Sequence, residues 1–245
     1  MGLQSRLRLS YRAWRYRLRI DPGEIHYLLA TLRPGQRALD IGAHKGAYSY
    51  WMSKAVDPGG EVFAFEPQPE LAAYLAGLAL PNLTVENLAL SSAAGEGMLN
   101  IPGHGPSPGA TLETRRGAAG RQMAVRLTTL DSYFAARSGP PVSLIKCDVE
   151  GHELPVLQGG AELLARDRPA LILECEARHH AGDSIADVFS WLDRLGYRGS
   201  FFLRGSRLPL EQFDAVKHQR PGHKPYVNNF IFEHEEGHPG ANDES

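Results

Sequence analysis

A short apolar run that ends at two glycines constrains this chain more than any other stretch. Residues 37–41 form the run, and Gly42 and Gly46 follow it. The next apolar residues recur at helical spacing: Tyr48, Trp51, Met52 and Ala55. This is the pattern of a strand, a tight turn and a helix. Glycine permits backbone angles that other residues avoid, and the helix start offers free N–H groups to an anionic or polar ligand.

Apolar runs then alternate with helical segments, which implies a parallel α/β sheet with right-handed crossovers. The first strands are expected over residues 37–41, 61–65 and 83–87. The second of them ends in Glu66, about twenty positions past the glycines, where an acid accepts hydrogen bonds from ribose hydroxyls. We therefore expect a cofactor that contains adenosine. Asn87 and Leu88 either line its adenine site or form an ordinary loop.

A second informative stretch begins with an apolar strand over residues 142–147. Four ionisable side chains follow within six residues: Asp148, Glu150, His152 and Glu153. In a doubly wound sheet, ligands bind beyond the carboxyl ends of the strands, where the strand order reverses. We expect this strand to neighbour the first one across that reversal, so that Asp148 faces the cofactor crevice. Glu153 is expected to cap the following helix.

The remaining elements complete the sheet and add an insertion. Residues 98–101 and 123–127 flank a stretch rich in Gly, Pro and Arg, which predicts an antiparallel hairpin with a mobile tip that forms a flap near the substrate. Later elements are expected as strands over 169–176, 197–203 and 226–232 and a helix over 185–195. The chain thus divides into a basic helix (1–20), a main domain (21–233) and a disordered polar tail (234–245).

The N-terminal helix has two interpretations. Its apolar side chains fall on one stripe: Leu3, Leu7, Tyr11, Trp14 and Leu18. The favoured interpretation packs this stripe on the domain and leaves the arginines in water. The alternative is a basic amphipathic helix that contacts anionic lipid, as a peripheral membrane contact of residues 3–19, or an acidic substrate.

Charge and composition narrow the possible partners. Residues 1–20 contain six arginines and no acid, so residues 21–245 carry 20 basic and 28 acidic side chains. An acidic body argues against nucleic-acid binding. The sequence has no apolar run long enough for a transmembrane helix, and its N-terminus lacks the apolar core of a signal peptide. Cys147 and Cys175 lie in apolar runs and are expected as buried thiols of a cytoplasmic protein.

With these stretches in hand, the chain resembles the FkbM-type family of S-adenosylmethionine-dependent methyltransferases over about residues 21–232. The resemblance rests on residues 39–46, 65–67, 129–131 and, above all, 145–153. The Lys-x-Asp-Val-Glu-Gly-x-Glu run within the last stretch is the specific motif. The chain departs from the family pattern at His44, where Asn is usual. The resemblance implies a class I methyltransferase fold, with a Rossmann-like, mostly parallel seven-stranded sheet and a final antiparallel strand. It also implies methyl transfer to oxygen, often a hydroxyl of a sugar or natural product.

The expected site follows from that chemistry. A sulfonium methyl is already activated, so the protein must align a nucleophile and accept its proton. The expected catalytic residues are His152, Asp148 and Glu150. His152 is the first choice as base, with a helix cap as its alternative role, and Asp148 is expected to contact the ammonium of S-adenosyl-L-methionine. The expected cofactor-binding residues are Asp40, Gly42, Ala43, His44, Gly46, Glu66, Pro67, Asn87, Leu88 and Asp148.

Three other functions fit part of the pattern. A nicotinamide-dependent oxidoreductase would need G-x-G-x-x-G, whereas these glycines are four apart. The second is a non-catalytic binding module of the same fold. The third is metal-assisted methyl transfer, although nothing in the residue spacing requires a metal. That metal would be held by Asp148, Glu174 or Glu176. The acceptor is expected to be a small-molecule or glycan hydroxyl, and an anionic one would meet basic segments at Arg115, Arg116, Arg121 and 217–224, unless these are solvated surface.

Overall fold

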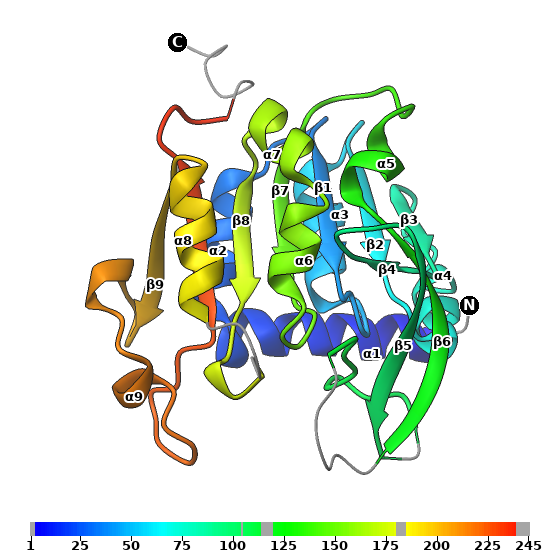
Figure 1. The fold of residues 1–245 in the computed structure, drawn as a ribbon. Helices are drawn as coiled ribbons and strands as arrows, with labels where there is room; N and C mark the ends of the chain where they lie inside the picture. The colour runs from blue at the N-terminus through cyan, green and yellow to red at the C-terminus, as the bar shows by residue number, and fades with distance from the viewer. Residues whose placement is uncertain (1–2, 104, 114–119, 180–184, 239–245) are drawn as a thin grey trace.

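In the part of the chain that the structure describes, eight strands form the central sheet, and helices cover both of its faces (Figure 1). The computed structural model describes residues 3–103, 105–113, 120–179 and 185–238. The strand order is β10-β9-β11-β8-β7-β1-β2-β3. The strands are β1 (Arg37–Ile41), β2 (Glu61–Phe65), β3 (Leu83–Glu86), β7 (Val142–Cys147), β8 (Ala170–Glu174), β9 (Tyr197–Leu203), β10 (Ser206–Pro209) and β11 (Asn229–His234).

The centre of the sheet is parallel and its β10 end is antiparallel. Strand β1 pairs in parallel with β2 and with β7, and both β1 and β7 are completely buried. Strand β11 runs antiparallel to both β8 and β9, which confirms the final antiparallel strand. The expected seven strands were one too few, because β10 pairs with β9 at the edge of the sheet. Its four residues, two of them exposed polar side chains, have no strand pattern of their own.

Two helical layers bury the sheet. One layer holds α2 (Pro22–Thr31) and α3 (Ala47–Val56), and α4 (Pro69–Ala76) contacts β3. The other layer comprises α5 (Leu130–Phe134), α6 (Glu153–Gln158), α7 (Ala161–Asp167) and α8 (Ile185–Arg194). The chain also forms two short 3₁₀ turns, Ala177–His179 and Leu210–Gln212, and the short helix α9 (Ala215–His218). Cys147 and Cys175 are buried free thiols, as predicted.

The predicted hairpin forms a small separate sheet. Strands β5 (Gly95–Pro102) and β6 (Gly120–Thr128) pair antiparallel, and β4 (Ala89–Leu90) joins β6. Leu99, Ile101 and Val125 build its own apolar core. The hairpin tip at 114–119, with Arg115 and Arg116, lies outside the described residues.

Helix α1 (Leu3–Arg15) and the π-helical turn η1 (Tyr16–Ile20) lie across the carboxyl ends of the central strands (Figure 1). The favoured interpretation of this segment was wrong about the face that packs. Leu9 and Ala13 are buried, whereas the predicted stripe at Leu7, Tyr11, Trp14 and Leu18 is 46–73% exposed. The small Ala13 lets the helix approach α3 closely, and the Trp51 indole donates a 2.9 Å hydrogen bond to the Ala13 carbonyl.

The C-terminal segment is ordered further than expected. His234 belongs to β11, and its ring packs edge-on against Tyr197. His238 Nδ1 lies 2.7 Å from the carbonyl oxygen of Asp167, and its Nε2 lies 3.1 Å from Ser143 Oγ. The prediction of a disordered tail from residue 234 was therefore wrong up to residue 238. Residues 239–245 lie outside the described part.

The central strands should dominate stability. Leu39→Ala empties a fully buried position of β1, so we expect the free energy of unfolding to fall by about 2–5 kcal/mol. Val216→Ala, at a position that is 83% exposed, should change it by about 0.5 kcal/mol or less. Urea unfolding followed by circular dichroism measures both. Equal destabilisation by the two variants would contradict this view of the core.

Candidate functional site

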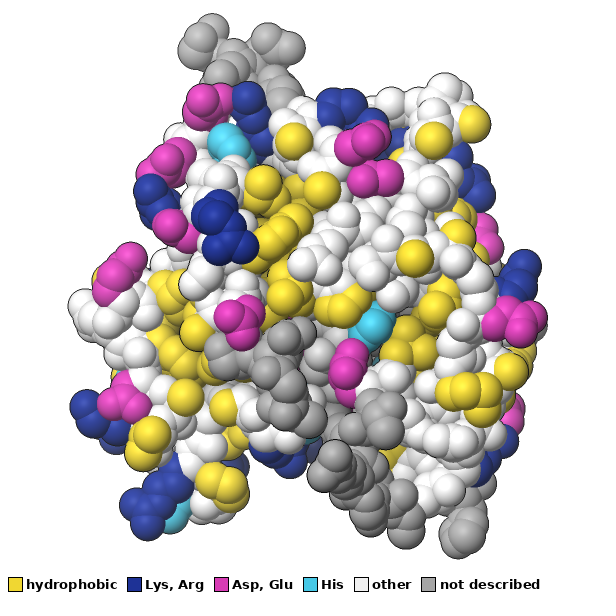
Figure 2. Space-filling model, in the orientation of Figure 1, with side chains coloured by type: hydrophobic (Ala, Val, Ile, Leu, Met, Phe, Trp, Pro, Cys, Tyr) yellow, Lys and Arg dark blue, Asp and Glu magenta, His cyan; other side chains and the backbone are white. Residues whose placement is uncertain are grey.

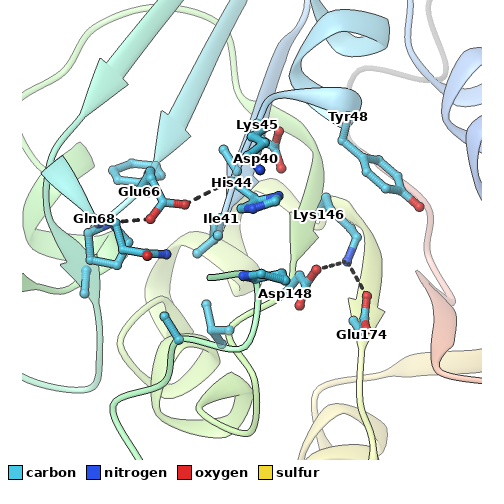
Figure 3. Close-up of a pocket in the computed structure, with 18 of the residues that line it drawn as sticks. Asp40, Ile41, His44, Lys45, Tyr48, Glu66, Gln68, Lys146, Asp148 and Glu174 are labelled. Carbon is cyan, nitrogen blue, oxygen red and sulfur yellow. Dashed lines mark hydrogen bonds and ion pairs between the residues drawn. The ribbon is translucent and has the colours of Figure 1, made fainter. Parts of the chain in front are cut away.

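A cavity of about 230 Å³ lies at the carboxyl ends of the central strands (Figure 3). The strand order reverses between β1 and β7, which is where an open α/β sheet binds its ligands. Asp40 from β1, Glu66 after β2 and Asp148 after β7 all line this cavity. The structure therefore brings the three predicted acids into one pocket.

Gly42 lets the two central strand ends meet. Its φ is +78°, and a Cβ on this residue would lie 1.8 Å from the Asp148 carbonyl oxygen. The Asp148 N–H in turn donates a 2.9 Å hydrogen bond to the Ile41 carbonyl. Gly46, also predicted as a cofactor contact, does not line the cavity. It lies at the start of α3, where a Cβ would be 2.8 Å from the Leu75 side chain, so it serves helix packing.

Glu66 is held by the backbone and faces the cavity. Its Oε2 accepts a 2.8 Å hydrogen bond from the His44 N–H, and its Oε1 accepts a 2.9 Å bond from the Gln68 N–H. Burial raises the pKa of Glu66 to about 7, although these N–H bonds favour its charged form. Each carboxylate oxygen keeps a further lone pair, so Glu66 can accept hydrogen bonds from ligand hydroxyls.

His44, the departure from the family pattern, turns into the cavity (Figure 3). Its φ of +48° belongs to the left-handed region, where Asn and His are both enriched. Among the described residues, its buried Nε2 has no hydrogen-bond partner. Burial lowers the pKa of His44 to about 4, so the ring is neutral at pH 7. A buried polar atom of this kind is matched by a ligand that hydrogen-bonds to it.

A buried ammonium group organises the acids on the other side of the cavity. Lys146 Nζ lies 3.9 Å from both Asp148 Oδ2 and Glu174 Oε2 (Figure 3). Burial opposes its charge, yet the two carboxylates and Asp21 raise the pKa of Lys146, which keeps it protonated. Burial also raises the pKa of Asp148 and of Glu174, an effect that Lys146 counteracts. Sequence reasoning gave Lys146 no role, although a lysine inside a buried apolar strand was the available signal.

Asp40 is enclosed more deeply than the other acids. Its carboxylate accepts a hydrogen bond from Ser49 Oγ, and only 2% of the residue is exposed. Burial raises the pKa of Asp40 to about 6.

Besides Gly46, three predicted or considered residues do not line the cavity. Asn87 donates hydrogen bonds to the carbonyls of Glu66 and Pro67, so it secures the loop, whereas Leu88 lines the cavity. Glu150 has a φ of +57°, and its carboxylate lies 2.9 Å from His179 Nδ1. The structure thus places Glu150 outside the cavity lining, and its catalytic role stays a prediction. Glu176, considered as a metal ligand, accepts hydrogen bonds from Arg178 and Tyr226.

His152 lines the cavity and is fixed through both ring nitrogens. Its Nδ1 lies 2.6 Å from Glu113 Oε1, and its Nε2 lies 2.9 Å from Ser91 Oγ. Although His152 stands at the N-cap of α6, its side chain makes no cap hydrogen bond. The alternative role as a helix cap therefore fails. Sequence reasoning missed Glu113 and Ser91, which are 39 and 61 positions away from His152.

The insertion reaches the cavity, as the predicted flap would. Ser107, Pro108 and residues 110–112, which follow β5, are part of its lining. The Gln68 side chain binds this segment through two 2.9 Å hydrogen bonds. Its Nε2 donates to the Ser107 carbonyl, and its Oε1 accepts from the Ser107 N–H. Thr111 Oγ1 donates a 2.9 Å bond to the Glu150 carbonyl.

Known proteins share this architecture and sequence pattern. The model of the methyltransferase FkbM domain matches residues 40–198. Hexuronic acid methyltransferase AglP of Haloferax volcanii is 29% identical over 154 residues, which cover 60% of this chain and 59% of that protein. Protein-L-isoaspartate O-methyltransferase of Aeropyrum pernix is 37% identical over 89 residues, 35% of this chain and 33% of that protein.

A solved structure extends the likeness to the whole fold. The methyltransferase FkbM of Methylobacillus flagellatus superimposes with a TM-score of 0.52 at 14% identity, covering 95% of this chain and 56% of that one. The chain spans between one third and three fifths of the length of these three proteins.

The cavity suits the cofactor of this family. Glu66 offers free lone pairs, His44 an unpaired ring nitrogen, and Gly42 a turn without a side chain. These features accompany a family match over most of the chain. The chain therefore belongs to the methyltransferase FkbM family.

Proposed function

We propose that this protein methylates a hydroxyl oxygen of a sugar, a glycan or a natural product. A hydroxyl must lose its proton as it attacks, so its methylation requires a proton acceptor at the cavity wall. The His152–Glu113 pair is the observation that carries the proposal. The partial similarity to a hexuronic acid methyltransferase supports a sugar as acceptor.

In this proposal, the turn after β1 and Glu66 would hold S-adenosyl-L-methionine. Glu66 accepts hydrogen bonds from the ribose hydroxyls, and Leu88 borders the adenine. The Asp148 carboxylate attracts the ammonium and sulfonium groups. The remaining cofactor contacts come from residues that line the cavity: Asp40, Gly42, Ala43, His44 and Pro67.

His152 acts as the base through Nε2. Its Nδ1–H donates to Glu113, which leaves Nε2 as the acceptor, and the same carboxylate stabilises the imidazolium that forms. Ser91 Oγ lies 2.9 Å from Nε2, and in this proposal the acceptor hydroxyl approaches Nε2 at the same position. A bound S-adenosyl-L-methionine would supply the methyl group for this transfer, while the residues of the chain orient the acceptor and take its proton. The acceptor proton passes to His152.

Removing the base should affect turnover and spare binding. We expect His152→Ala to lower kcat by about 10²–10⁴-fold and to leave the affinity for S-adenosylhomocysteine unchanged. Glu113→Gln should lower kcat less, because the ring keeps its place but loses its carboxylate. Candidate sugars and glycans incubated with S-adenosylmethionine, analysed by mass spectrometry, would identify the acceptor and provide the assay. His26→Ala, at an exposed position of α2 outside the cavity lining, is the control. Unchanged kcat in His152→Ala, or a methyl group found on nitrogen or carbon, would contradict the proposal.

Cofactor affinity should depend on pH through Glu66. Because its pKa is raised to about 7, Glu66 gains a proton as the pH falls through that value and loses an acceptor for ribose. Binding of S-adenosylhomocysteine, measured by calorimetry, should weaken by up to about fivefold from pH 7 to pH 6 and level off above about pH 8. Asp40, with a pKa of about 6, contributes only at lower pH.

A matched pair of variants isolates this effect. Glu66→Gln should bind weakly and without the slope between pH 6 and pH 7, whereas the exposed Glu211→Gln should keep the slope. Retention of the slope in Glu66→Gln would show that another group titrates.

A further inference from the structure

The N-terminal segment exposes a concentration of large apolar side chains. Of the seven large hydrophobic residues that are exposed in the described part of the chain, five lie between residues 7 and 20. They are Leu7, Tyr11, Trp14, Leu18 and Ile20. The first four have the spacing of a single face of a helix. A contiguous apolar patch of this kind on a folded protein marks an interaction surface.

Three side chains of this stripe, Leu7, Tyr11 and Leu18, are 60–73% exposed, whereas Trp14 is 46% exposed and packs edge-on against Trp51 of α3. Leu9 and Ala13 on the other face are buried, and Ala13 accepts the hydrogen bond from Trp51. Arg12 also points to the domain, donating a 3.2 Å hydrogen bond to the Lys45 carbonyl. The segment is therefore docked through one face and presents a second apolar face outward.

The charges beside the stripe are all positive. Arg8, Arg15 and Arg19 are exposed, and each follows directly after an exposed apolar residue of the stripe. Residues 1–20 contain no acid, whereas the rest of the chain is acidic. On the face of the molecule that Figure 2 shows, basic and acidic side chains are instead interspersed. The stripe thus combines an apolar surface with a row of unopposed cations.

An anionic lipid bilayer fits this combination. Its headgroups attract arginines, and its acyl boundary accepts Leu, Trp and Tyr side chains from a helix that lies in the plane of the interface. A second copy of the chain fits less well, because two such faces would bring their arginines together without any acid from residues 1–20. No helix in the described ranges has both the length and the apolar character needed to cross a membrane.

We propose that α1 and η1 form a docking surface for anionic membranes, with the helix axis parallel to the bilayer. Arg12, Tyr16 and Ile20 of the same segment line the cavity. Docking therefore places the cavity about one helix diameter, roughly 10 Å, from the lipid headgroups. The proposal concerns this surface alone and stands apart from the acceptor that the cavity takes.

Vesicle sedimentation tests the proposal on the full chain. We expect the protein to bind vesicles of phosphatidylcholine with about one third phosphatidylglycerol, and vesicles of phosphatidylcholine alone much more weakly. Raising the salt from about 0.1 M to about 0.5 M should weaken binding to the anionic vesicles. The emission of Trp14, the most exposed of the three tryptophans, should shift to the blue on binding, and Trp14→Phe should abolish the shift.

Two triple variants separate charge from apolar contact. Replacing Arg8, Arg15 and Arg19 by Gln should weaken binding at least about tenfold. Replacing Leu7, Tyr11 and Leu18 by Ser should weaken it by a similar factor, and both proteins should keep the wild-type unfolding temperature because these side chains are exposed. The matched control removes the same charge elsewhere, by replacing the exposed Arg194, Arg204 and Arg220 by Gln, and should bind like the wild type.

The contrary results are equally clear. Equal binding to both kinds of vesicle, no binding at all, or wild-type binding by the arginine variant would overturn the proposal. A concentration-dependent dimer in sedimentation velocity that the serine variant abolishes, in a protein that ignores vesicles, would assign the stripe to a second copy. None of these outcomes depends on methyl transfer.

Discussion

The contact between the ends of β1 and β7 sets the position of everything in the cavity. Parallel pairing brings Ile41 opposite Cys147, and Gly42 then passes so close to the Asp148 carbonyl that no side chain fits between them. Asp40 and Asp148 come to line the same cavity because one precedes this turn and the other follows β7. The strand order also reverses here, so no crossover covers the opening. A substituent at Gly42 would push the two strand ends apart and separate these acids.

Such a cavity holds several charged groups out of water, and the protein supports each of them differently. Glu66 relies on two backbone N–H groups, and Lys146 on two carboxylates. Burying charges is unfavourable unless they are paired or hydrogen-bonded, so these groups are poor contributors to stability. The raised pKa values of Glu66, Asp40 and Asp148 reflect this unfavourable burial of charge. Their concentration where the sheet binds ligands is typical of a functional site.

The sequence predicted the features that depend on neighbouring residues, and it did not predict contacts between segments far apart in the chain. The strands with their terminal acids were readable because a buried parallel strand is a continuous apolar run, and its carboxyl end marks a ligand edge. The partners of His152 could not be read, because Glu113 and Ser91 come from distant segments that only the folded hairpin brings near. The N-terminal helix shows a different limit. Its sequence contains two apolar faces. The face with the smaller side chain, Ala13, packs on the domain, because it lets Trp51 approach and donate a hydrogen bond to the Ala13 carbonyl.

Two segments outside the central sheet, the hairpin insertion and the N-terminal segment, complete the wall of the cavity. The sheet itself supplies the acids, and the hairpin insertion supplies Glu113 together with the wall clasped by Gln68. The N-terminal segment contributes Arg12 and Tyr16 to the lining. Side chains at the strand ends are fixed by the register of the sheet, whereas the insertion and the terminal helix can change without disturbing that register. For the proposed reaction, we therefore expect acceptor preference to depend on these two segments and binding of the methyl donor to depend on the sheet.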